Sequence, residues 1–206
     1  MKNKLLIIGA SGHGKVVADI ALEMGKWEKV AFLDDNPAVT SCLGLDVVGT
    51  SEDFKKFIDD YDFFVAIGDN DIRKKVYQKL ESLSASIPVL IHPGAVVGRE
   101  VLIECGTVLM AGVIVNCNTR IGKGCILNTG STVDHDNLIG DFVHVSPGVH
   151  LAGTVIVGSG SWLGVGSVIK NNVSICEGIM IGAGAVVVND IITAGVYVGV
   201  PVRRVK

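Results

Sequence analysis

Aromatic residues are scarce in this 206-residue chain. They make up 5% of it, although 49% of the residues are apolar and 26 are glycine. A core with this composition has to be built from small aliphatic side chains, which favours narrow and repetitive packing. The composition therefore favours a repetitive fold.

Long apolar runs and a surplus of positive charge are also missing. No segment approaches the roughly 20 consecutive apolar residues of a membrane-spanning helix. The formal net charge is −3, and no long basic run offers an electrostatic surface to nucleic acid or to an anionic membrane. The opening apolar run, residues 5–8, is too short for a signal peptide and leads into a glycine turn. We expect a soluble, cytoplasmic protein whose partners include neither nucleic acid nor membrane.

Cysteine is infrequent and irregularly spaced. The five cysteines are an odd number, and no two of them form a C-x-x-C pair. A disulfide framework or a zinc knuckle needs other spacings, whereas free cysteine behaves as a small hydrophobic residue. We therefore expect buried thiols.

The first 87 residues alternate short aliphatic runs with mixed, charged segments, which is typical of parallel strands and helices in turn. The sequence predicts strands at residues 4–8, 30–33 and 63–67, and helices at residues 15–24 and 71–83. The inner face of the first helix is expected to carry Val16, Val17, Ile20 and Ala21. We interpret residues 1–87 as a Rossmann-like α/β domain with a ligand crevice at the carboxyl ends of its strands.

A six-residue period governs the sequence from residue 91 onward. Glycine recurs directly after the repeated residue or three places after it, as in IGKGCI and LGVGSV, where a chain that turns a corner needs unusual backbone angles. Such a period is the signature of a solenoid. The repeated residue is aliphatic at 17 consecutive positions: Ile91, Val97, Ile103, Leu109, Val115, Ile121, Leu127, Val133, Ile139, Val145, Leu151, Val157, Leu163, Ile169, Ile175, Ile181 and Val187.

Each hexad is interpreted as one flat face of a three-sided coil. Three hexads close one turn, with the aliphatic residue pointing inward and small residues at the corners. Successive coils stack at about 4.8 Å, so about six coils bury a continuous core. The unbroken register over residues 91–192 predicts no long external loop. We interpret residues 88–206 as an all-β parallel β-helix, whose handedness the period alone leaves open.

The densest cluster of titratable side chains inside the repeat is centred on His135. Asp134 and Asp136 flank it, and its third place in the hexad VDHDNL is expected to face solvent from a flat face. Two carboxylates can orient the imidazole and raise its basicity. A neutral imidazole near pH 7 suits proton acceptance from an attacking amine. A surface histidine with acidic neighbours explains the same pattern.

A zinc site is a further interpretation of this region. His135, His144 and His150 are separated by 9 and 6 residues. One class of carbonic anhydrases binds zinc on a β-helix through three histidines, but the close pair of histidines in those enzymes has no counterpart in these intervals, and no third ligand is evident. A metal site is therefore not predicted, and His150 is expected to be a surface residue.

A glycine-rich turn follows the first predicted strand. The sequence GASGHGK places Gly9, Gly12 and Gly14 between a strand and a helix, which is the setting of a phosphate-binding turn. The spacing is not the G-x-G-x-x-G of dinucleotide enzymes, and the Walker-A spacing of ATPases is absent because Val16 follows Lys15. By itself, the turn indicates either a phosphate site or a tight strand-to-helix connection.

Both halves of the chain resemble one family. The aliphatic-glycine hexads over residues 91–192 look like the hexapeptide-repeat transferases. The stretch LNTGSTVDHDNLIGDFVHVSPGVHLAGTVIVG closely resembles bacterial UDP-4-amino-sugar N-acetyltransferases of bacillosamine-type pathways and related sialic acid O-acetyltransferases. GASGHG, FLDD and YDFFVAIGDNDIRKKVYQKL resemble the N-terminal domain of the same enzymes. The resemblance implies a left-handed β-helix, a homotrimer with active sites between subunits, acetyl-CoA as co-substrate and no metal.

The resemblance also implies roles for individual residues. His135 matches the proposed general base and Asp136 the acidic residue that tunes it, although a longer glutamate is frequent at the position of Asp136. The residues that match acetyl-CoA contacts are His144, Gly153, Val165 and Ala183. The residues assigned to the nucleotide-sugar substrate are Ser11, Gly12, His13, Asp34, Asp35, Gly68 and Asn128.

The expected activity is direct acetyl transfer from acetyl-CoA to the amine of a nucleotide-linked amino sugar, with UDP-4-amino-4,6-dideoxy-N-acetylglucosamine as the expected acceptor. A backbone N–H such as that of Gly153 is expected near the developing oxyanion. Two alternatives stay open: O-acetylation of a sialic acid by the same His135, and a non-catalytic assembly module whose N-terminal domain senses a nucleotide.

Overall fold

The computed structural model describes residues 2–206, which form two compact units with the boundary between Pro93 and Gly94. The division lies at Pro93 and not at residue 87, because a short strand, β6 (Leu90–Ile91), packs against the first helix of the N-terminal unit. Over residues 2–206, no helix combines the length and the apolar character that a bilayer crossing requires.

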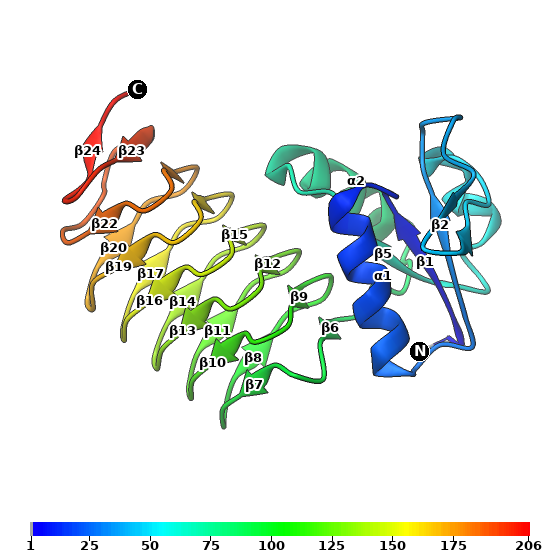
Figure 1. Cartoon of the computed structure of the whole chain (residues 1–206), viewed down its shortest axis with the longest axis horizontal. Coiled ribbons are helices and arrows are strands. Elements are labelled where there is room, and N and C mark those ends of the chain that lie inside the picture. Colours follow the sequence, from blue (N-terminus) through cyan, green and yellow to red (C-terminus); the bar gives the residue numbers. More distant parts are fainter. Residues whose placement is uncertain (1) are drawn as a thin grey trace. The chain divides into compact units, whose positions relative to one another are not determined.

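A three-stranded parallel sheet of order β2-β1-β5 forms the centre of the first unit. The register pairs Ile8 with Leu33 on one side and with Val65 on the other, so the three strands end at one edge. The strands are almost wholly buried, and Figure 1 shows helix α1 beside β1, both in blue. The elements before β6 are β1 (Lys4–Ile8), α1 (Gly12–Met24), β2 (Lys29–Leu33), β3 (Ser41–Cys42), β4 (Leu45–Asp46), the 3-10 helix η1 (Ser51–Lys56), β5 (Asp62–Val65) and α2 (Asn70–Ser82).

The predicted strands and helices of the first unit are found, with shifted ends. Helix α1 begins three residues before the predicted start, because the backbone N–H of Lys15 already donates to the carbonyl of Ser11 at 3.0 Å. The placement of Val16 on the inner face is wrong: its side chain is 41% exposed, and Ala18 is buried instead. A helical step of about 100° per residue puts residue 18, and not residue 16, on the face that carries Val17 and Ala21.

The hairpin β3-β4 and the helix η1 lie in a segment to which the sequence assigned no element. Two-residue strands and a short 3-10 helix are too brief to produce a hydrophobic period. Their signal in the sequence was therefore too weak to detect.

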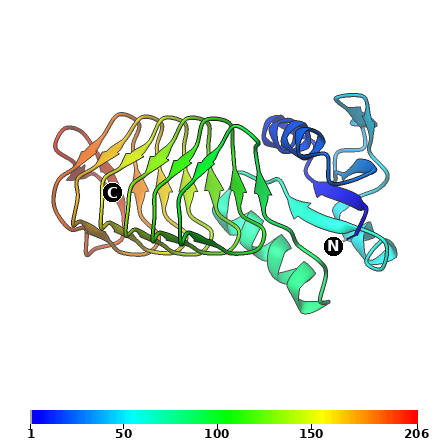
Figure 2. The same ribbon diagram turned by 90° about the horizontal axis from the view of Figure 1, so that it is seen from below.

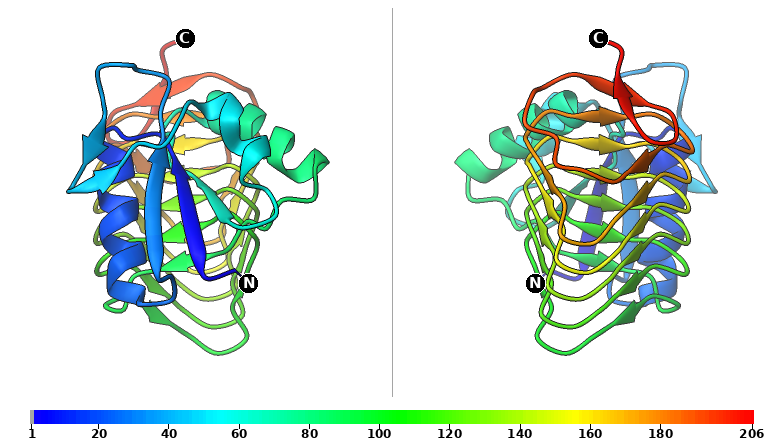
Figure 3. Two further views of the ribbon diagram at one scale, coloured as in Figure 1. Left: turned by 90° about the vertical axis from the view of Figure 1, so that its right-hand side faces the viewer. Right: turned by 90° about the vertical axis from the view of Figure 1, so that its left-hand side faces the viewer.

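The second unit is a parallel β-helix with three strands per coil. Its strands form three parallel ladders, of order β22-β19-β16-β13-β10-β7 (first sheet), β20-β17-β14-β11-β8 (second sheet) and β23-β21-β18-β15-β12-β9 (third sheet), with β24 added antiparallel to β23. Figures 2 and 3 show the successive coils stacked from green to red. The predicted fold class, an α/β domain followed by a parallel β-helix, is confirmed.

Each strand of the coils is short and follows the predicted period. Residues eighteen apart are paired, as Arg120 with Leu138 and then Leu138 with Ile156. The strands are β7 (Val96–Val97), β8 (Leu102–Ile103), β9 (Val108–Leu109), β10 (Ile114–Val115), β11 (Arg120–Ile121), β12 (Ile126–Leu127), β13 (Thr132–Val133), β14 (Leu138–Ile139), β15 (His144–Val145), β16 (His150–Leu151), β17 (Ile156–Val157), β18 (Trp162–Leu163), β19 (Val168–Ile169), β20 (Ser174–Ile175), β21 (Met180–Ile181), β22 (Val186–Val187), β23 (Val196–Val198) and β24 (Arg203–Arg204).

The core of the second unit consists of the repeated aliphatic residues. All of them from Leu109 to Val187 are buried. Val97 is exposed and Ile103 is half-buried, because no earlier coil of this unit covers the first one. The predicted inward-facing position of the hexad is therefore confirmed from the second coil onward.

The corners between the strands adopt one backbone conformation. Every sixth residue from Glu100 to Gly184 has a positive φ, between 55° and 72°. Most of these residues are glycines at the third place after the aliphatic residue. The glycines directly after the aliphatic residue are required for a different reason, which is lack of space. A Cβ on Gly140 would lie 2.7 Å from the backbone nitrogen of Ser159 in the next coil. At those positions glycine permits close stacking of the coils.

One edge of the prism departs from the glycine rule. The corner that joins the first and second sheets carries side chains at all five positive-φ positions, and we call it the His135 edge. These five residues, one per coil, are Glu100, Asn118, Asp136, Thr154 and Asn172.

Candidate functional site

His135 lies on the His135 edge, between β13 and β14. This position corrects the expectation that it stands on a flat face: the strand β13 ends at Val133, β14 begins at Leu138, and residues 134–137 between them form the corner. The His135 side chain is 52% exposed. A corner projects farther into solvent than a sheet face, so the imidazole is accessible to a ligand that approaches from outside the coil.

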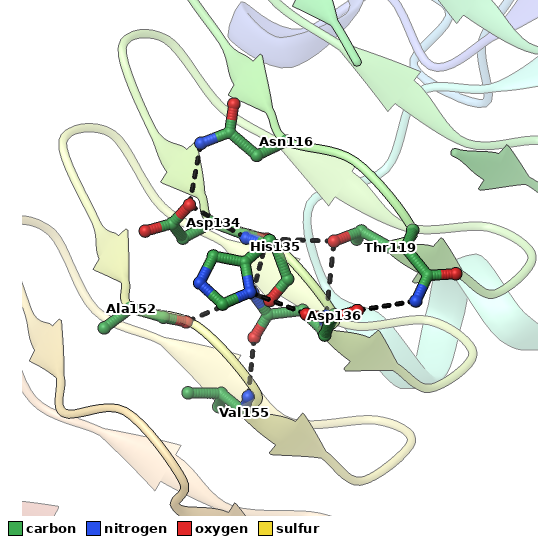
Figure 4. Close-up of polar contacts among 9 residues, drawn as sticks. Asn116, Thr119, Asp134, His135, Asp136, Ala152 and Val155 are labelled. Atoms are coloured by element: carbon green, nitrogen blue, oxygen red, sulfur yellow. Dashed lines mark hydrogen bonds and ion pairs between the residues drawn. The ribbon is translucent and has the colours of Figure 1, made fainter. Parts of the chain in front are cut away.

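Asp136 holds the ring of His135 by a short hydrogen bond. Its Oδ2 lies 2.6 Å from Nδ1 of His135 (Figure 4). An ionised carboxylate can only accept, so Nδ1 carries the proton and Nε2 is left with a lone pair. Although glutamate is the longer residue, the reach of Asp136 is sufficient here.

Asp134 acts on the backbone and not on the ring. Its Oδ1 accepts from the backbone N–H of His135 at 2.9 Å and from Nδ2 of Asn116 at 2.8 Å (Figure 4). The expectation that both flanking carboxylates orient the imidazole is therefore corrected. Asp134 fixes the start of the corner and contributes negative charge near the ring.

These carboxylates make His135 a stronger base. The hydrogen bond to Asp136 raises the pKa of His135 above its ordinary value, and the negative charges of Asp134 and Asp136 add to the increase. Hydrogen bonds from Asn118 and His135 lower the pKa of Asp136, so its carboxylate stays ionised. The ring is consequently neutral only above this raised pKa, and its capacity to accept a proton falls as the pH drops through it.

Two buried polar side chains support the corner from inside. Nδ2 of Asn137 donates to the carbonyls of Asp134 at 2.6 Å and Ala152 at 3.1 Å, and its Oδ1 accepts from the backbone N–H of Val155 at 2.9 Å. Oγ1 of Thr119 donates to the carbonyl of Asp134 at 2.9 Å. Corner carbonyls that would otherwise be buried without a partner are thus satisfied, which keeps the backbone at His135 rigid.

Gly153 makes room for the imidazole. It lies one coil after His135 on the same edge, and a Cβ added there would come within 2.6 Å of both Cε1 and Nε2 of the ring. The sequence could not reveal this packing, because it depends on the conformation of the His135 side chain. Gly153 therefore belongs with His135 and Asp136 in the structure, whatever else it contacts.

His144 lies on the third sheet, with a second group of residues. Only 8% of it is exposed, and its ring stacks on that of Trp162, with 4.9 Å between the centroids and 18° between the planes. Its Nε2 is 3.5 Å from Nδ2 of Asn128. Trp162 donates from its indole N–H to Oγ of Ser146 at 2.9 Å. The structure thus brings Asn128 to His144, and not to His135.

An apolar groove of about 300 Å³ continues from Trp162 along the third sheet. It contains Val165 and Ala183, two residues of the predicted acetyl-CoA set, together with Trp162 and Met180, which the sequence analysis did not single out. The signal was available: Trp162 holds an outward place in a repeat that is otherwise poor in aromatics. The lining residues are Ser146, Trp162, Gly164, Val165, Met180, Ile181, Gly182, Ala183 and Val196.

The two groups lie on different edges of one prism. His135, Asp136 and Gly153 occupy the corner between the first and second sheets, whereas Val165 and Ala183 lie on the corner between the third and first sheets. The full width of the first sheet separates them. Within a single chain, the predicted acetyl-CoA residues therefore do not all come together.

The glycine turn of the first unit is built tightly onto the ends of the strands. A Cβ on Gly14 would lie 2.0 Å from the carbonyl oxygen of Gly9, so only glycine fits there. Asp34, directly after β2, accepts the backbone N–H of Ala10 at 2.6 Å and ties the turn to the neighbouring strand. Ser11 and Gly12 are exposed on this turn and His13 is half-buried.

The remaining two predicted residues of the first unit have different surroundings. Gly68 follows β5 at the same edge of the sheet, and its carbonyl accepts from the buried guanidinium of Arg73 at 2.9 Å. Asp35 is directed to the start of η1, where it accepts from the backbone N–H of Ser51 at 2.7 Å and from its Oγ at 2.9 Å. Ser11, Gly12, His13, Asp34 and Gly68 thus share one edge, and Asp35 is engaged elsewhere.

The cysteines differ from the expectation of buried thiols. Cys42 and Cys125 are buried, Cys176 is intermediate, and Cys105 and Cys117 are exposed. The two exposed thiols lie at corner positions of the coils, which the period alone did not distinguish from inward ones. Among residues 2–206, no group of three His, Cys, Asp or Glu side chains is arranged to hold a metal ion.

Comparisons with known proteins agree with both units. Residues 4–80 match the family model described as PglD N-terminal domain. The chain is 32% identical to the GDP-perosamine N-acetyltransferase of Escherichia coli O157:H7 over 185 aligned residues. The alignment covers 86% of this chain and 82% of that protein. It is also 34% identical to the UDP-N-acetylbacillosamine N-acetyltransferase of Bacillus subtilis (strain 168) over 106 aligned residues. This alignment covers 50% of this chain and 49% of that protein.

A solved structure extends the similarity over the whole chain. The acetyltransferase domain of PglB from Neisseria gonorrhoeae FA1090, in complex with acetyl coenzyme A, superimposes with a TM-score of 0.97. The two sequences are 38% identical, and the alignment covers 100% of each chain.

Gly153→Ala tests the packing of the imidazole. The added methyl group should displace the ring of His135 and destabilise the protein by about 1–3 kcal/mol, the usual cost of overpacking. In a His135→Ala background the same substitution should cost much less, because the ring is gone, and this coupling is measurable as a double-mutant cycle of urea unfolding. Equal costs in the two backgrounds would show that the ring does not rest on Gly153.

Proposed function

This chain belongs to the hexapeptide-repeat sugar N-acetyltransferases, which use acetyl-CoA, and on that basis we propose that it acetylates the amine of a nucleotide-linked amino sugar with His135 as general base. The observation that carries the proposal is the His135–Asp136 pair on an exposed corner, at 2.6 Å, with Nε2 directed away from the carboxylate. This arrangement supplies an accessible lone pair on a base whose pKa is raised.

The chemistry requires one proton transfer on each side of a tetrahedral intermediate. The amine nitrogen attacks the thioester carbonyl, a C–N bond forms, and Nε2 of His135 accepts the proton that the nitrogen loses. When the C–S bond breaks, the imidazolium returns this proton to the leaving thiolate of CoA. Asp136 stabilises the intermediate imidazolium through Nδ1. We propose the backbone N–H of Gly153, beside the ring, as the group near the developing oxyanion.

We propose that the groove along the third sheet holds the pantetheine arm of acetyl-CoA. Its lining is mostly apolar, and Trp162 and Met180 offer a broad contact surface for a flexible, weakly polar chain. His144 stacks on Trp162 and so contributes to the same wall. Val165 and Ala183, which match acetyl-CoA contacts in the family, lie in this groove.

The separation of the base from the groove supports a site shared between copies. We propose a cyclic homotrimer in which the His135 edge of one subunit faces the groove of its neighbour. Apolar side chains exposed on the first and second sheets, among them Val96, Ile114, Leu102, Leu138 and Ile156, offer surface for such packing. A ring of identical heterologous contacts closes without leaving an unpaired edge.

The first unit is proposed to hold the nucleotide. The turn at Ser11 and Gly12 begins a helix, where backbone N–H groups favour a phosphate. Asp34 and Gly68 border the same edge of the sheet.

Our first candidate acceptor is UDP-4-amino-4,6-dideoxy-N-acetylglucosamine. A GDP-linked amino sugar is the second candidate, because the relative that matches over most of its length acts on GDP-perosamine. We place the reaction in the cytoplasm, where acetyl-CoA and nucleotide sugars are available.

His135→Ala tests the proposed base. Thiol release from acetyl-CoA is measured with a panel of UDP-, GDP- and dTDP-linked 4-amino sugars, and the wild type should turn over one of them. With that acceptor, His135→Ala should lower kcat about 10²- to 10⁴-fold, the usual contribution of a general base. His150→Ala, which removes an exposed histidine from the next hexad but one, should retain full activity. Retention of wild-type kcat in His135→Ala, or thiol release with no member of the panel, would contradict the proposal.

Mixing two inactive variants tests the shared site. His135→Ala removes the base, and Ala183→Trp fills the groove. If each site combines an edge from one subunit with the groove of its neighbour, co-expression of the two in equal amounts should restore about one quarter of the sites, by random assembly of a cyclic trimer. His135→Ala co-expressed with His135→Gln is the control and should stay inactive. No recovery in the first mixture would assign the base and the groove to the same subunit.

A further inference from the structure

Asn118 occupies the corner directly before Asp136 on the His135 edge. It lies one coil earlier, eighteen residues away, and has the same positive φ, 57° against 58° for Asp136. Its Nδ2 donates to Oδ1 of Asp136 at 2.5 Å. The amide must present its nitrogen to this oxygen, because an ionised carboxylate offers no proton in return.

We propose that Asn118 is a positioning residue for the base: by holding Oδ1 of Asp136, it directs Oδ2 of the same carboxylate onto Nδ1 of His135. The inference rests on the proposed role of His135, and it adds a third member, from a different coil, to the His135–Asp136 pair. Asn118 does not touch the reacting atoms in this scheme and acts only through Asp136.

The two oxygens of Asp136 have separate partners, which is the geometric basis of the proposal. One oxygen accepts from Asn118 and the other from His135. The Asp136 side chain is 46% exposed, so without Asn118 its carboxylate could rotate and exchange the ring for water. With Asn118 in place, rotation costs a charge-assisted hydrogen bond, and the carboxylate stays in the plane that reaches Nδ1.

The backbone conformation at residue 118 is compatible with this role. A positive φ favours glycine, and nine of the fifteen equivalent corners from residue 100 to residue 184 use it. Asparagine tolerates this conformation better than most residues but gains nothing from it over glycine. Asn118 therefore fits the corner without needing glycine, and its amide is hydrogen-bonded to Asp136.

Few of the residues that surround His135 on its own corner and on the two neighbouring coils can carry a charge. Asp134 and Asp136 flank it on its own corner, and the preceding coil presents Asn116, Cys117 and Asn118. The following coil presents Ala152, Gly153 and Thr154, none of which ionises near neutral pH. Asn118 contacts Asp136, whereas Asp134 is held by Asn116, so we expect substitution of Asn118 to change the titration of His135 through Asp136.

Asn118→Gly tests the inference without straining the corner, because glycine adopts the same backbone conformation. Asn172→Gly is the matched control: it makes the same substitution at the same edge and the same φ, two coils beyond Asp136. The pKa of His135 is measured by NMR titration of its ring protons in the free protein, with Asp136→Asn as the reference for complete loss of the carboxylate. The signal is assigned by its absence in His135→Ala.

The expected order of the His135 pKa is wild type equal to Asn172→Gly, then Asn118→Gly, then Asp136→Asn as the lowest. In the acetyl transfer assay, Asn118→Gly should lower kcat about three- to tenfold, the scale of one hydrogen bond, and leave the KM for acetyl-CoA unchanged. The acidic limb of its pH-rate profile should move to lower pH. A His135 pKa in Asn118→Gly equal to that of the wild type would overturn the inference.

The NMR titration and the activity assay together separate this inference from the proposed function. If His135→Ala retained activity, the proposed base would fail, yet the NMR titration would still report whether Asn118 controls the His135–Asp136 contact. If His135→Ala were inactive and the titration of Asn118→Gly were unaltered, only the role of Asn118 would fall. A raised KM with unchanged kcat would indicate instead that Asn118 contacts the substrate.

Discussion

The corner that recurs every six residues is the constraint on which the rest of the second unit depends. A residue with positive φ lies in each corner between two short strands, and three such corners close one coil every eighteen residues. Equivalent residues of neighbouring coils then stack at the spacing of a parallel sheet. Because of this register, Asn118, Asp136 and Thr154 share an edge although they are far apart in the sequence. A polar ladder is thus assembled with no loop or insertion.

The same geometry divides the chemistry between two edges. In a three-sided coil each position of the eighteen-residue turn lies on one face or at one corner. Residues at different corners of one chain therefore cannot contact each other. His135 and Asp136 share a corner with Gly153, while Trp162 and Ala183 line the groove along the third sheet, and the first sheet lies between the two sites. A rigid solenoid cannot bend to join them. Assembly of several copies is the simplest way to bring a base and a thioester together in such a scaffold.

Most of the fold could be predicted from the sequence, because both units have strong periodic signals. The aliphatic hexads determined the strands and the inward positions, and the aliphatic runs located β1, β2 and β5. What failed depended on conformation. Val16 was placed on the buried face of α1, where Ala18 lies instead. His135 was assigned to a face because the period does not show which hexad place forms the corner. Likewise, the sequence named Asp134 and Asp136 as neighbours of His135 but could not show which of them reaches the ring.

A crystal structure with acetyl-CoA and an unreactive acceptor analogue tests the central claim most directly. The account predicts a thioester carbonyl close to Nε2 of His135 in one subunit, with the pantetheine arm against Trp162 and Ala183 of the neighbouring subunit. The same structure should keep the hydrogen bonds from Asn118 to Asp136 and from His135 to Asp136. An acetyl-CoA bound wholly within one subunit, with its thioester distant from every His135, would contradict the account.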